Sequence, residues 1–153
     1  MKQTTIVEII AALFILLFLY TALSKIYDYN NFRFVLAGSP MIGNISSSIA
    51  VVLPITEIII AALLFIPKTK LFGFYGAFVL MTIFTFYIGY MIVFAPKLPC
   101  SCGGVLKLLT WKQHFIFNIF FILLALIGIL IKRRTYKVNL GQKLDPYLLN
   151  EHY

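Results

Sequence analysis

Four apolar stretches, each close to the length of a membrane-spanning helix, constrain the fold of this chain more than any other feature. They lie at about residues 6–24, 45–66, 71–95 and 111–131. A helix needs about 20 apolar residues to cross the hydrocarbon core of a bilayer, where every backbone polar group must be hydrogen bonded within the protein. The sequence therefore predicts an all-α integral membrane protein: residues 1–131 form a four-helix bundle, and residues 132–153 form a short cytoplasmic tail.

The composition argues against a soluble fold. Hydrophobic residues make up 61% of the chain and charged residues only 12%, whereas about 25% of the residues of a soluble domain are charged. No polar segment is available to cover the four apolar stretches. The formal net charge of +8 is explained by anionic lipid and membrane topology, so we expect the lipid bilayer, and no nucleic acid, as a partner.

The first apolar stretch also has features of a cleavable signal peptide. Lys2 precedes it, and it ends in Ala22-Leu23-Ser24, a run that a signal peptidase could recognise. However, the apolar run is longer than the core of a typical signal peptide and it contains Glu8. We therefore expect an uncleaved membrane helix.

The distribution of basic residues predicts the orientation in the membrane. With four crossings, one side holds Lys2, Lys68, Lys70, Lys132, Arg133, Arg134, Lys137 and Lys143, and the other holds Lys25, Arg33, Lys97, Lys107 and Lys112. Cytoplasmic loops carry the excess of basic residues. The sequence therefore predicts a multi-pass protein of the bacterial inner membrane with both termini in the cytoplasm and residues 96–110 on the periplasmic face.

Rows of mostly small residues predict which helix faces meet. The third stretch carries Gly73, Ala77, Met81, Thr85 and Gly89 at four-residue spacing, and the second carries Ala50, Pro54, Glu57 and Ala61 on one face. Small residues let helices approach closely in lipid, where hydrophobicity does not drive association. We expect these rows to point into the bundle, and the faces rich in Phe, Ile and Leu to meet lipid.

The only two cysteines, Cys100 and Cys102, are candidate catalytic residues. Their Cα atoms can be at most about 7 Å apart, whereas a disulfide needs about 4.4–6.8 Å, so a bond requires a bend at Ser101. A strained bond is easily reduced, which suits thiol–disulfide exchange, and Gly103 and Gly104 leave the backbone free to change shape. The alternatives are a structural disulfide and two idle thiols.

His114 is the third candidate catalytic residue. It lies twelve residues after Cys102 and could hold a thiolate or carry its proton as a disulfide opens. Alternatively, it is an interfacial histidine bonded to a carbonyl or to water. Two cysteines and one histidine at this spacing fit no common tetrahedral metal site, so we expect no metal.

Glu57 is the most unusual residue within the predicted spans. It lies about ten residues, or about 15 Å, from either face of the membrane, where a charged carboxylate costs on the order of 2.5–3.5 kcal/mol. It must be protonated or paired. Together with Asn118 it could form a proton path or bind a quinone. Alternatively, Glu57 fixes helix register through a hydrogen bond to Thr82, Thr85, Asn118 or a tyrosine.

The segment after the first predicted helix carries two further expectations. Lys25 and Asp28 are spaced to pair along a helix surface. Residues 30–34 read as an amphipathic segment at the membrane interface, with Arg33 directed toward lipid headgroups or a partner.

The order of these motifs resembles that of the DoxX-like superfamily, and in particular of the methylamine utilisation protein MauE type. The resemblance spans about residues 5–131 and consists of Ser24-Lys25-Ile26, Asp28 and Phe32, then Pro54 and Glu57, then the Cys-Ser-Cys sequence before the fourth helix. It implies a redox-associated four-helix membrane protein. For MauE, the proposed task is maturation of a disulfide-rich periplasmic enzyme subunit. By position, Cys100 and Cys102 would be the redox pair.

These observations predict a membrane-embedded thiol–disulfide redox or maturation factor. Its partner would be a periplasmic protein with thiols or a disulfide, such as a thioredoxin-like protein, and a quinone could carry its electrons. Whether it is itself a thiol–disulfide oxidoreductase stays open. The alternatives are a soft-metal transporter or metallochaperone that uses the same thiols, and a non-catalytic subunit of a larger membrane complex.

The predicted orientation can be tested by labelling the cysteines from outside. We expect a membrane-impermeant maleimide to label Cys100 and Cys102 on intact spheroplasts, while a tag at the C-terminus becomes accessible to antibody only after permeabilisation. The Cys100→Ser/Cys102→Ser double variant is the unlabelled control. Labelling that requires permeabilisation would contradict the prediction.

Overall fold

The computed structural model describes residues 2–38, 43–94 and 111–148, and every element in these ranges is helical. The elements are α1 (Lys2–Tyr27), α2 (Tyr29–Ala37), the short 3₁₀ helix η1 (Gly43–Ile45), α3 (Ser46–Phe65), α4 (Lys70–Phe94) and α5 (Trp111–Leu148). Four segments of this part of the chain are long and apolar enough to cross a membrane: Thr4–Tyr27, Gly43–Phe65, Lys70–Phe94 and Lys112–Lys137. The prediction of an all-α protein with four long apolar helices is confirmed.

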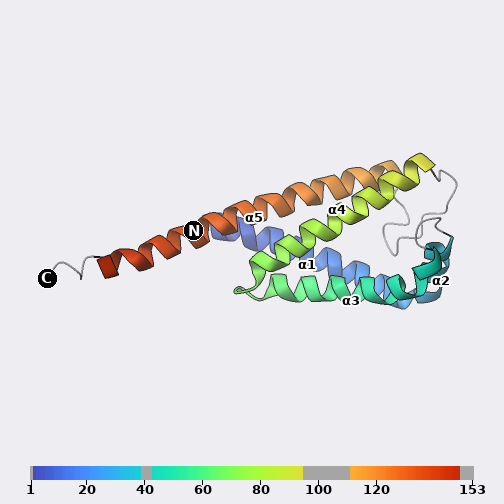
Figure 1. Ribbon diagram of the computed structural model, residues 1–153, viewed down its shortest axis with the longest axis horizontal. Helices are drawn as coiled ribbons and strands as arrows, with labels where there is room; N and C mark the ends of the chain where they lie inside the picture. The colour runs from blue at the N-terminus through green and yellow to red at the C-terminus, as the bar shows by residue number, and fades with distance from the viewer. Residues whose placement is uncertain (1, 39–42, 95–110, 149–153) are drawn as a thin grey trace.

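The four long helices run side by side along one axis (Figure 1). The start of α1, the turn between α3 and α4 and the C-terminal part of α5 lie at one end of the bundle, and α2 lies across the other end. α5 is 38 residues long. It continues well beyond residue 131, where the sequence predicted the start of a tail, and extends past the other helices.

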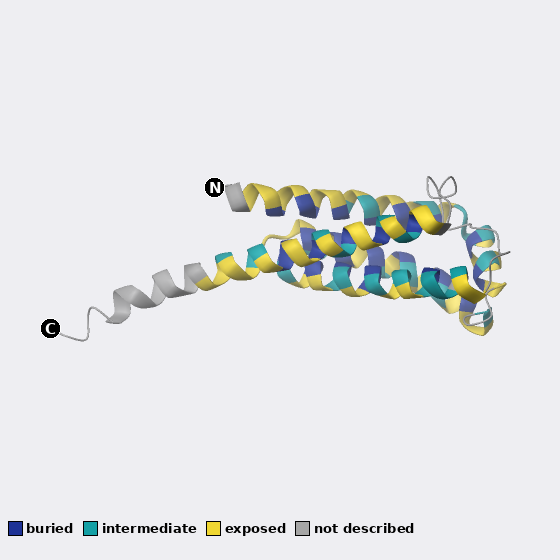
Figure 2. Ribbon diagram, turned by 90° about the horizontal axis from the view of Figure 1, so that it is seen from above, coloured by how far each residue is buried: buried dark blue, intermediate teal, exposed yellow. Residues whose placement is uncertain are grey.

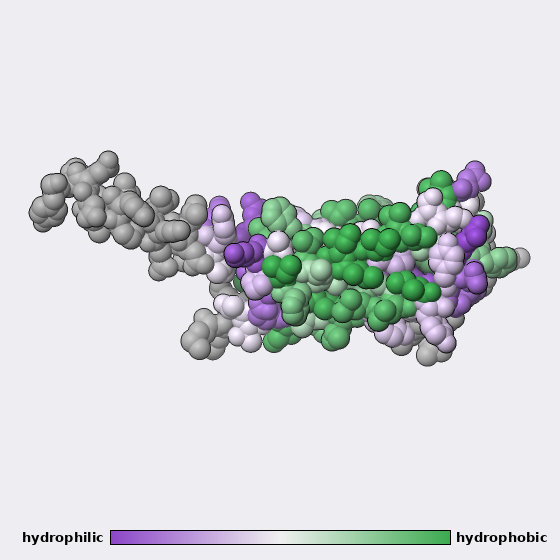
Figure 3. Space-filling model, turned by 90° about the horizontal axis from the view of Figure 1, so that it is seen from below, coloured by the Kyte–Doolittle hydropathy of each residue, from purple (hydrophilic) through white to green (hydrophobic). Residues whose placement is uncertain are grey.

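The outer surface of the bundle is suited to lipid. Large apolar side chains are exposed on every long helix, among them Leu16 (68%), Phe86 (76%) and Ile116 (67%). On the face shown in Figure 3, apolar side chains form a band over the middle of the bundle, and hydrophilic residues lie toward both ends. An apolar surface of this extent is unfavourable in water but is solvated by hydrocarbon.

The predicted inward-facing rows are largely confirmed. Ala50, Pro54, Glu57 and Ala61 are all buried, as are Gly73, Ala77 and Met81, whereas Thr85 and Gly89 are half-buried. Buried residues accordingly lie on the sides of the helices that face one another (Figure 2).

The expectation that phenylalanines face lipid is wrong for the centre of the bundle. Phe14, Phe18 and Phe74 are among the largest fully buried side chains, and Phe121 is only 7% exposed. The rings of Phe14 and Phe121 meet edge to face with centroids 5.2 Å apart, a favourable geometry for aromatic pairs. The small residues leave space between the helices, and these rings fill it.

The predicted amphipathic segment forms α2, which covers one end of the bundle. Phe32 and Leu36 are buried and pack against Ala50 of α3, whereas Arg33 and Phe34 are exposed. α2 therefore fixes its buried face on α3 and presents its other face outward.

Two glycines permit close contacts between the long helices. A Cβ atom on Gly73 would lie 2.8 Å from the backbone nitrogen of Leu64, so α4 touches the backbone of α3 at this point. A Cβ atom on Gly128 would lie 2.7–2.9 Å from ring atoms of Phe74. Neither position has room for a larger residue without a shift of its neighbour.

Gly73→Ala should therefore destabilise the protein. The added methyl group must displace the α3 backbone, and overpacking of this kind costs about 1–3 kcal/mol. The matched control is Gly89→Ala, because only the Phe115 ring approaches its Cβ position, at 3.5 Å, and alanine is the better helix former. Thermal unfolding in detergent should show a lower Tm for Gly73→Ala alone; equal values for both variants would contradict the close contact.

Candidate functional site

The centre of the candidate site is a buried ion pair between α1 and α3. The Nζ atom of Lys25 donates a hydrogen bond to Oε1 of Glu57 at 2.5 Å. The exposed fractions of the two side chains are 7% and 1%. Lys25 lies near the end of α1, but its flexible stem lets the ammonium reach inward to a carboxylate in the middle of α3.

Aromatic rings complete the surroundings of the Lys25 ammonium. Nζ lies 5.9 Å from the centroid of the Phe32 ring and 5.6 Å from that of the Phe84 ring. At these distances a cation is attracted to the face of an aromatic ring. Lys25 is thus held by one carboxylate and two rings, which come from α3, α2 and α4.

This pair supplies a partner for Lys25 and for Glu57 that the sequence analysis missed. Lys25 is buried, although its spacing to Asp28 suggested a place on the helix surface; Asp28 accepts a hydrogen bond from Asn31 at 3.0 Å. Thr82 and Thr85, two of the predicted partners of Glu57, donate to carbonyl oxygens of their own helix. The sequence did hold a signal for this ion pair. It has a long basic side chain near the end of one span and a lone acid within another.

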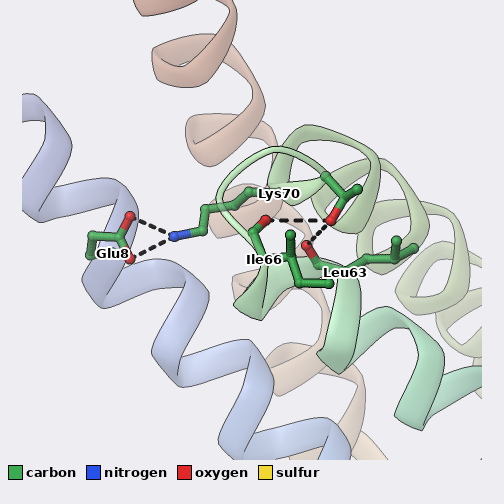
Figure 4. Close-up of polar contacts among 5 residues, drawn as sticks. Glu8, Leu63, Ile66 and Lys70 are labelled. Atoms are coloured by element: carbon green, nitrogen blue, oxygen red, sulfur yellow. Dashed lines mark hydrogen bonds and ion pairs between the residues drawn. The ribbon is translucent and has the colours of Figure 1, made fainter.

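A second ion pair joins α1 to α4 at the opposite end of the bundle. The Lys70 ammonium contacts both carboxylate oxygens of Glu8, at 2.5 and 2.6 Å (Figure 4). The Lys70 side chain is 3% exposed, but that of Glu8 is 56% exposed. The Glu8 carboxylate is therefore accessible from outside the bundle, and this pair costs less to bury than the pair of Lys25 and Glu57.

A cavity of about 600 Å³ lies beside the Lys25–Glu57 pair. Its walls come from all five α-helices and are mostly Leu, Ile, Val and Phe side chains. The polar side chains in the wall include Thr21 and Lys25 of α1, Glu57 of α3, and His114 and Asn118 of α5. We name these five residues the polar cluster.

Three atoms of the polar cluster are buried with unused hydrogen-bonding capacity. Glu57 Oε2, His114 Nδ1 and Asn118 Nδ2 have no hydrogen-bond partner among the described residues. Glu57, His114 and Asn118 are 1%, 6% and 2% exposed. A buried polar atom without a partner costs about 1–3 kcal/mol, so three of them in residues that line one cavity mark a region suited to a polar ligand group.

The structure brings together three of the sequence-predicted site residues. His114 and Asn118 lie one turn apart on α5, and Glu57 faces the same cavity from α3. Lys25 belongs to the wall of the same cavity as His114. Glu57 and Asn118, named above as candidates for a quinone or proton path, thus line the same cavity.

Cys100 and Cys102 lie outside the described residues. They belong to the connection between the end of α4 at Phe94 and the start of α5 at Trp111, and His114 stands in the first turn of α5. Within the described ranges, no group of three or more His, Cys, Asp and Glu side chains could hold a metal ion.

A comparison with protein-family models matches residues 3–131 to the family described as methylamine utilisation protein MauE. The match covers α1 to α4 and the apolar part of α5. No curated protein matches the chain, and no solved structure matches it.

The burial of the Lys25–Glu57 pair predicts a large cost for breaking it. Glu57→Gln leaves the Lys25 charge buried without its partner and should destabilise the protein by about 3–5 kcal/mol, while Lys25→Met/Glu57→Met should regain most of that loss. Lys70→Met is the matched control and should cost about 1 kcal/mol or less, since the Glu8 carboxylate that it leaves unpaired is 56% exposed and water can solvate it. Chemical unfolding in detergent measures all three; equal losses for Glu57→Gln and Lys70→Met would contradict the assignment.

Proposed function

The chain belongs to the family of methylamine utilisation protein MauE, and from this premise we propose that it is a membrane-embedded thiol–disulfide redox or maturation factor. It is a multi-pass membrane protein with four candidate spans among its described residues. In this proposal, Cys100 and Cys102 serve protein partners on the periplasmic side of the inner membrane.

The position of the two cysteines is the observation that carries the proposal. They are one residue apart in the connection between two membrane-spanning helices, and the chain has no other cysteine. A bilayer anchor keeps such a pair at one membrane face, where soluble partners can reach it. Two thiols that are close in the chain can also resolve each other's mixed disulfides, which a lone thiol cannot do.

The proposed reaction is an exchange of one disulfide for another. The thiolate of one cysteine attacks a sulfur of the partner's disulfide; the partner's S–S bond breaks, a mixed disulfide forms and the other partner sulfur leaves as a thiolate. The second cysteine of the pair then attacks the mixed disulfide and releases the partner. The partner has gained two electrons as a dithiol, and Cys100 and Cys102 have lost two as a disulfide. Every step is reversible.

His114 is the proposed proton carrier for this exchange. It stands in the first turn of α5 and lies twelve residues after Cys102 in the chain. Nδ1 of His114 has no hydrogen-bond partner among the described residues, and an imidazole nitrogen can take up or release a proton near neutral pH. These properties support a role for His114 in moving the proton that a cysteine loses when it becomes the attacking thiolate.

Two alternatives use the same chain differently. A soft-metal transporter or metallochaperone would bind Cu(I) or Hg(II) with the two thiolates, and reduced protein would then bind metal stoichiometrically. A non-catalytic subunit of a larger complex would need neither thiol, and a Cys100→Ser/Cys102→Ser variant would then retain full cellular function.

The proposal predicts that single cysteine variants trap a partner. In Cys100→Ser or Cys102→Ser, the remaining thiolate can form the mixed disulfide but nothing within the pair resolves it. Non-reducing electrophoresis of cells treated with acid and alkylating agent should show a larger species in at least one single variant, which collapses on reduction. The double variant is the control and should show none; absence of the species from both single variants would refute the exchange.

A further inference from the structure

The unused hydrogen-bonding atoms of the polar cluster define what the cavity can bind. Asn118 Nδ2 is a donor, Glu57 Oε2 of a carboxylate is an acceptor, and His114 Nδ1 can be either, according to which ring nitrogen carries the proton. The residues that carry these atoms come from two different helices and belong to the wall of one cavity. A matching ligand must therefore accept hydrogen bonds from Asn118 and His114. A ligand that also has a hydroxyl form could donate a hydrogen bond to Glu57.

The Nζ atom of Lys25 is not one of the three unpartnered atoms. Its ammonium is already bonded to Glu57 Oε1 and flanked by the Phe32 and Phe84 rings. The pair leaves little net charge to attract an ionic ligand. The site therefore favours a neutral polar group over a phosphate or a carboxylate.

The rest of the cavity is apolar and reaches the lipid-facing surface. Ile45, Val52 and Ile83 belong to its wall, yet they are 55%, 59% and 57% exposed. In a membrane these three side chains meet hydrocarbon, so a ligand can enter sideways from the bilayer between α3 and α4. A volume of about 600 Å³ falls within the range of small-molecule sites.

We propose that this cavity binds the head group of an isoprenoid quinone. The Asn118 amide and the His114 imidazole donate to quinone carbonyl oxygens, and Glu57 Oε2 accepts from a hydroxyl of the reduced quinol. The isoprenoid tail leaves over Val52 and Ile83 into the bilayer. A lipid acyl chain would fill the apolar walls but would leave all three polar atoms without partners.

Bound quinone would complete the electron balance of the proposed function, and this step alone rests on that function. When the exchange runs in reverse, Cys100 and Cys102 gain two electrons and two protons from a partner's dithiol, and they lose them again when their own disulfide re-forms. One quinone takes up the same two electrons and two protons and becomes a quinol, which can leave into the bilayer. Quinone binding itself requires neither cysteine.

The test is quinone binding by the full-length protein in nanodiscs of synthetic phosphatidylcholine. A photoreactive azidoquinone is the probe, and decylubiquinone and a naphthoquinone analogue are the competitors. We expect saturable labelling, displaced by a competitor, on peptides of α1, α3 or α5. Labelling that neither competitor displaces, or that lies only outside the cavity wall, would overturn the proposal.

Two variants examine the polar and the apolar parts separately. Asn118→Leu removes one hydrogen bond without adding a polar group and should weaken competitor binding about fivefold to tenfold; Asn30→Leu, outside the cavity wall, should leave it unchanged. Val52→Trp narrows the entrance without touching the polar cluster and should also weaken binding, whereas Ile59→Trp, exposed on the same helix, should not. Unchanged binding in correctly folded Val52→Trp would overturn the proposal even if Asn118→Leu failed to fold.

The Cys100→Ser/Cys102→Ser variant separates this proposal from the proposed function. It should bind quinone like the unmodified chain, because the polar cluster is intact. Trapped partners without quinone binding would leave the exchange function standing and refute the site. Quinone binding without trapped partners would support the site and refute the exchange function.

Discussion

A charge inside hydrocarbon must find its counter-charge within the protein, and this constraint organises the bundle. Glu57 cannot stand alone in the middle of α3 at an acceptable cost, so Lys25 turns inward from the end of α1 to meet it. The pair fixes how α1 and α3 lie against each other. It also leaves Glu57 Oε2 as an unused acceptor, so the same contact helps to build the polar wall of the cavity.

The two ion pairs hold α1 at both ends of the bundle. Lys25 joins it to α3, and Glu8 joins it to α4. Between them lies an aromatic core in which Phe14 contacts Phe18, Phe74 and Phe121. Because lipid competes equally well for apolar side chains, helix association here depends on close packing and polar contacts rather than on hydrophobicity.

Much of the fold could be predicted from the sequence, because the length of an apolar span and the spacing of small residues can both be read within a single helix. The burial of Ala50, Pro54, Glu57 and Ala61 followed from their spacing alone. The burial of Phe14 and Phe74 did not, because a phenylalanine suits lipid and protein interior equally in a membrane. For the same reason, the inward turn of Lys25 was missed: near a helix end its side chain could equally have extended to the headgroups.

The sequence by itself determined the class of the protein, the number of its long apolar helices, and the residues that needed an explanation: two cysteines, Glu57, His114 and Asn118. Only the tertiary structure decided that Lys25 forms the ion pair with Glu57 and that Glu57, His114 and Asn118 line one cavity. The physical reason is that hydropathy and periodicity act within one helix, whereas the partner of a buried polar group is chosen by the way different helices pack.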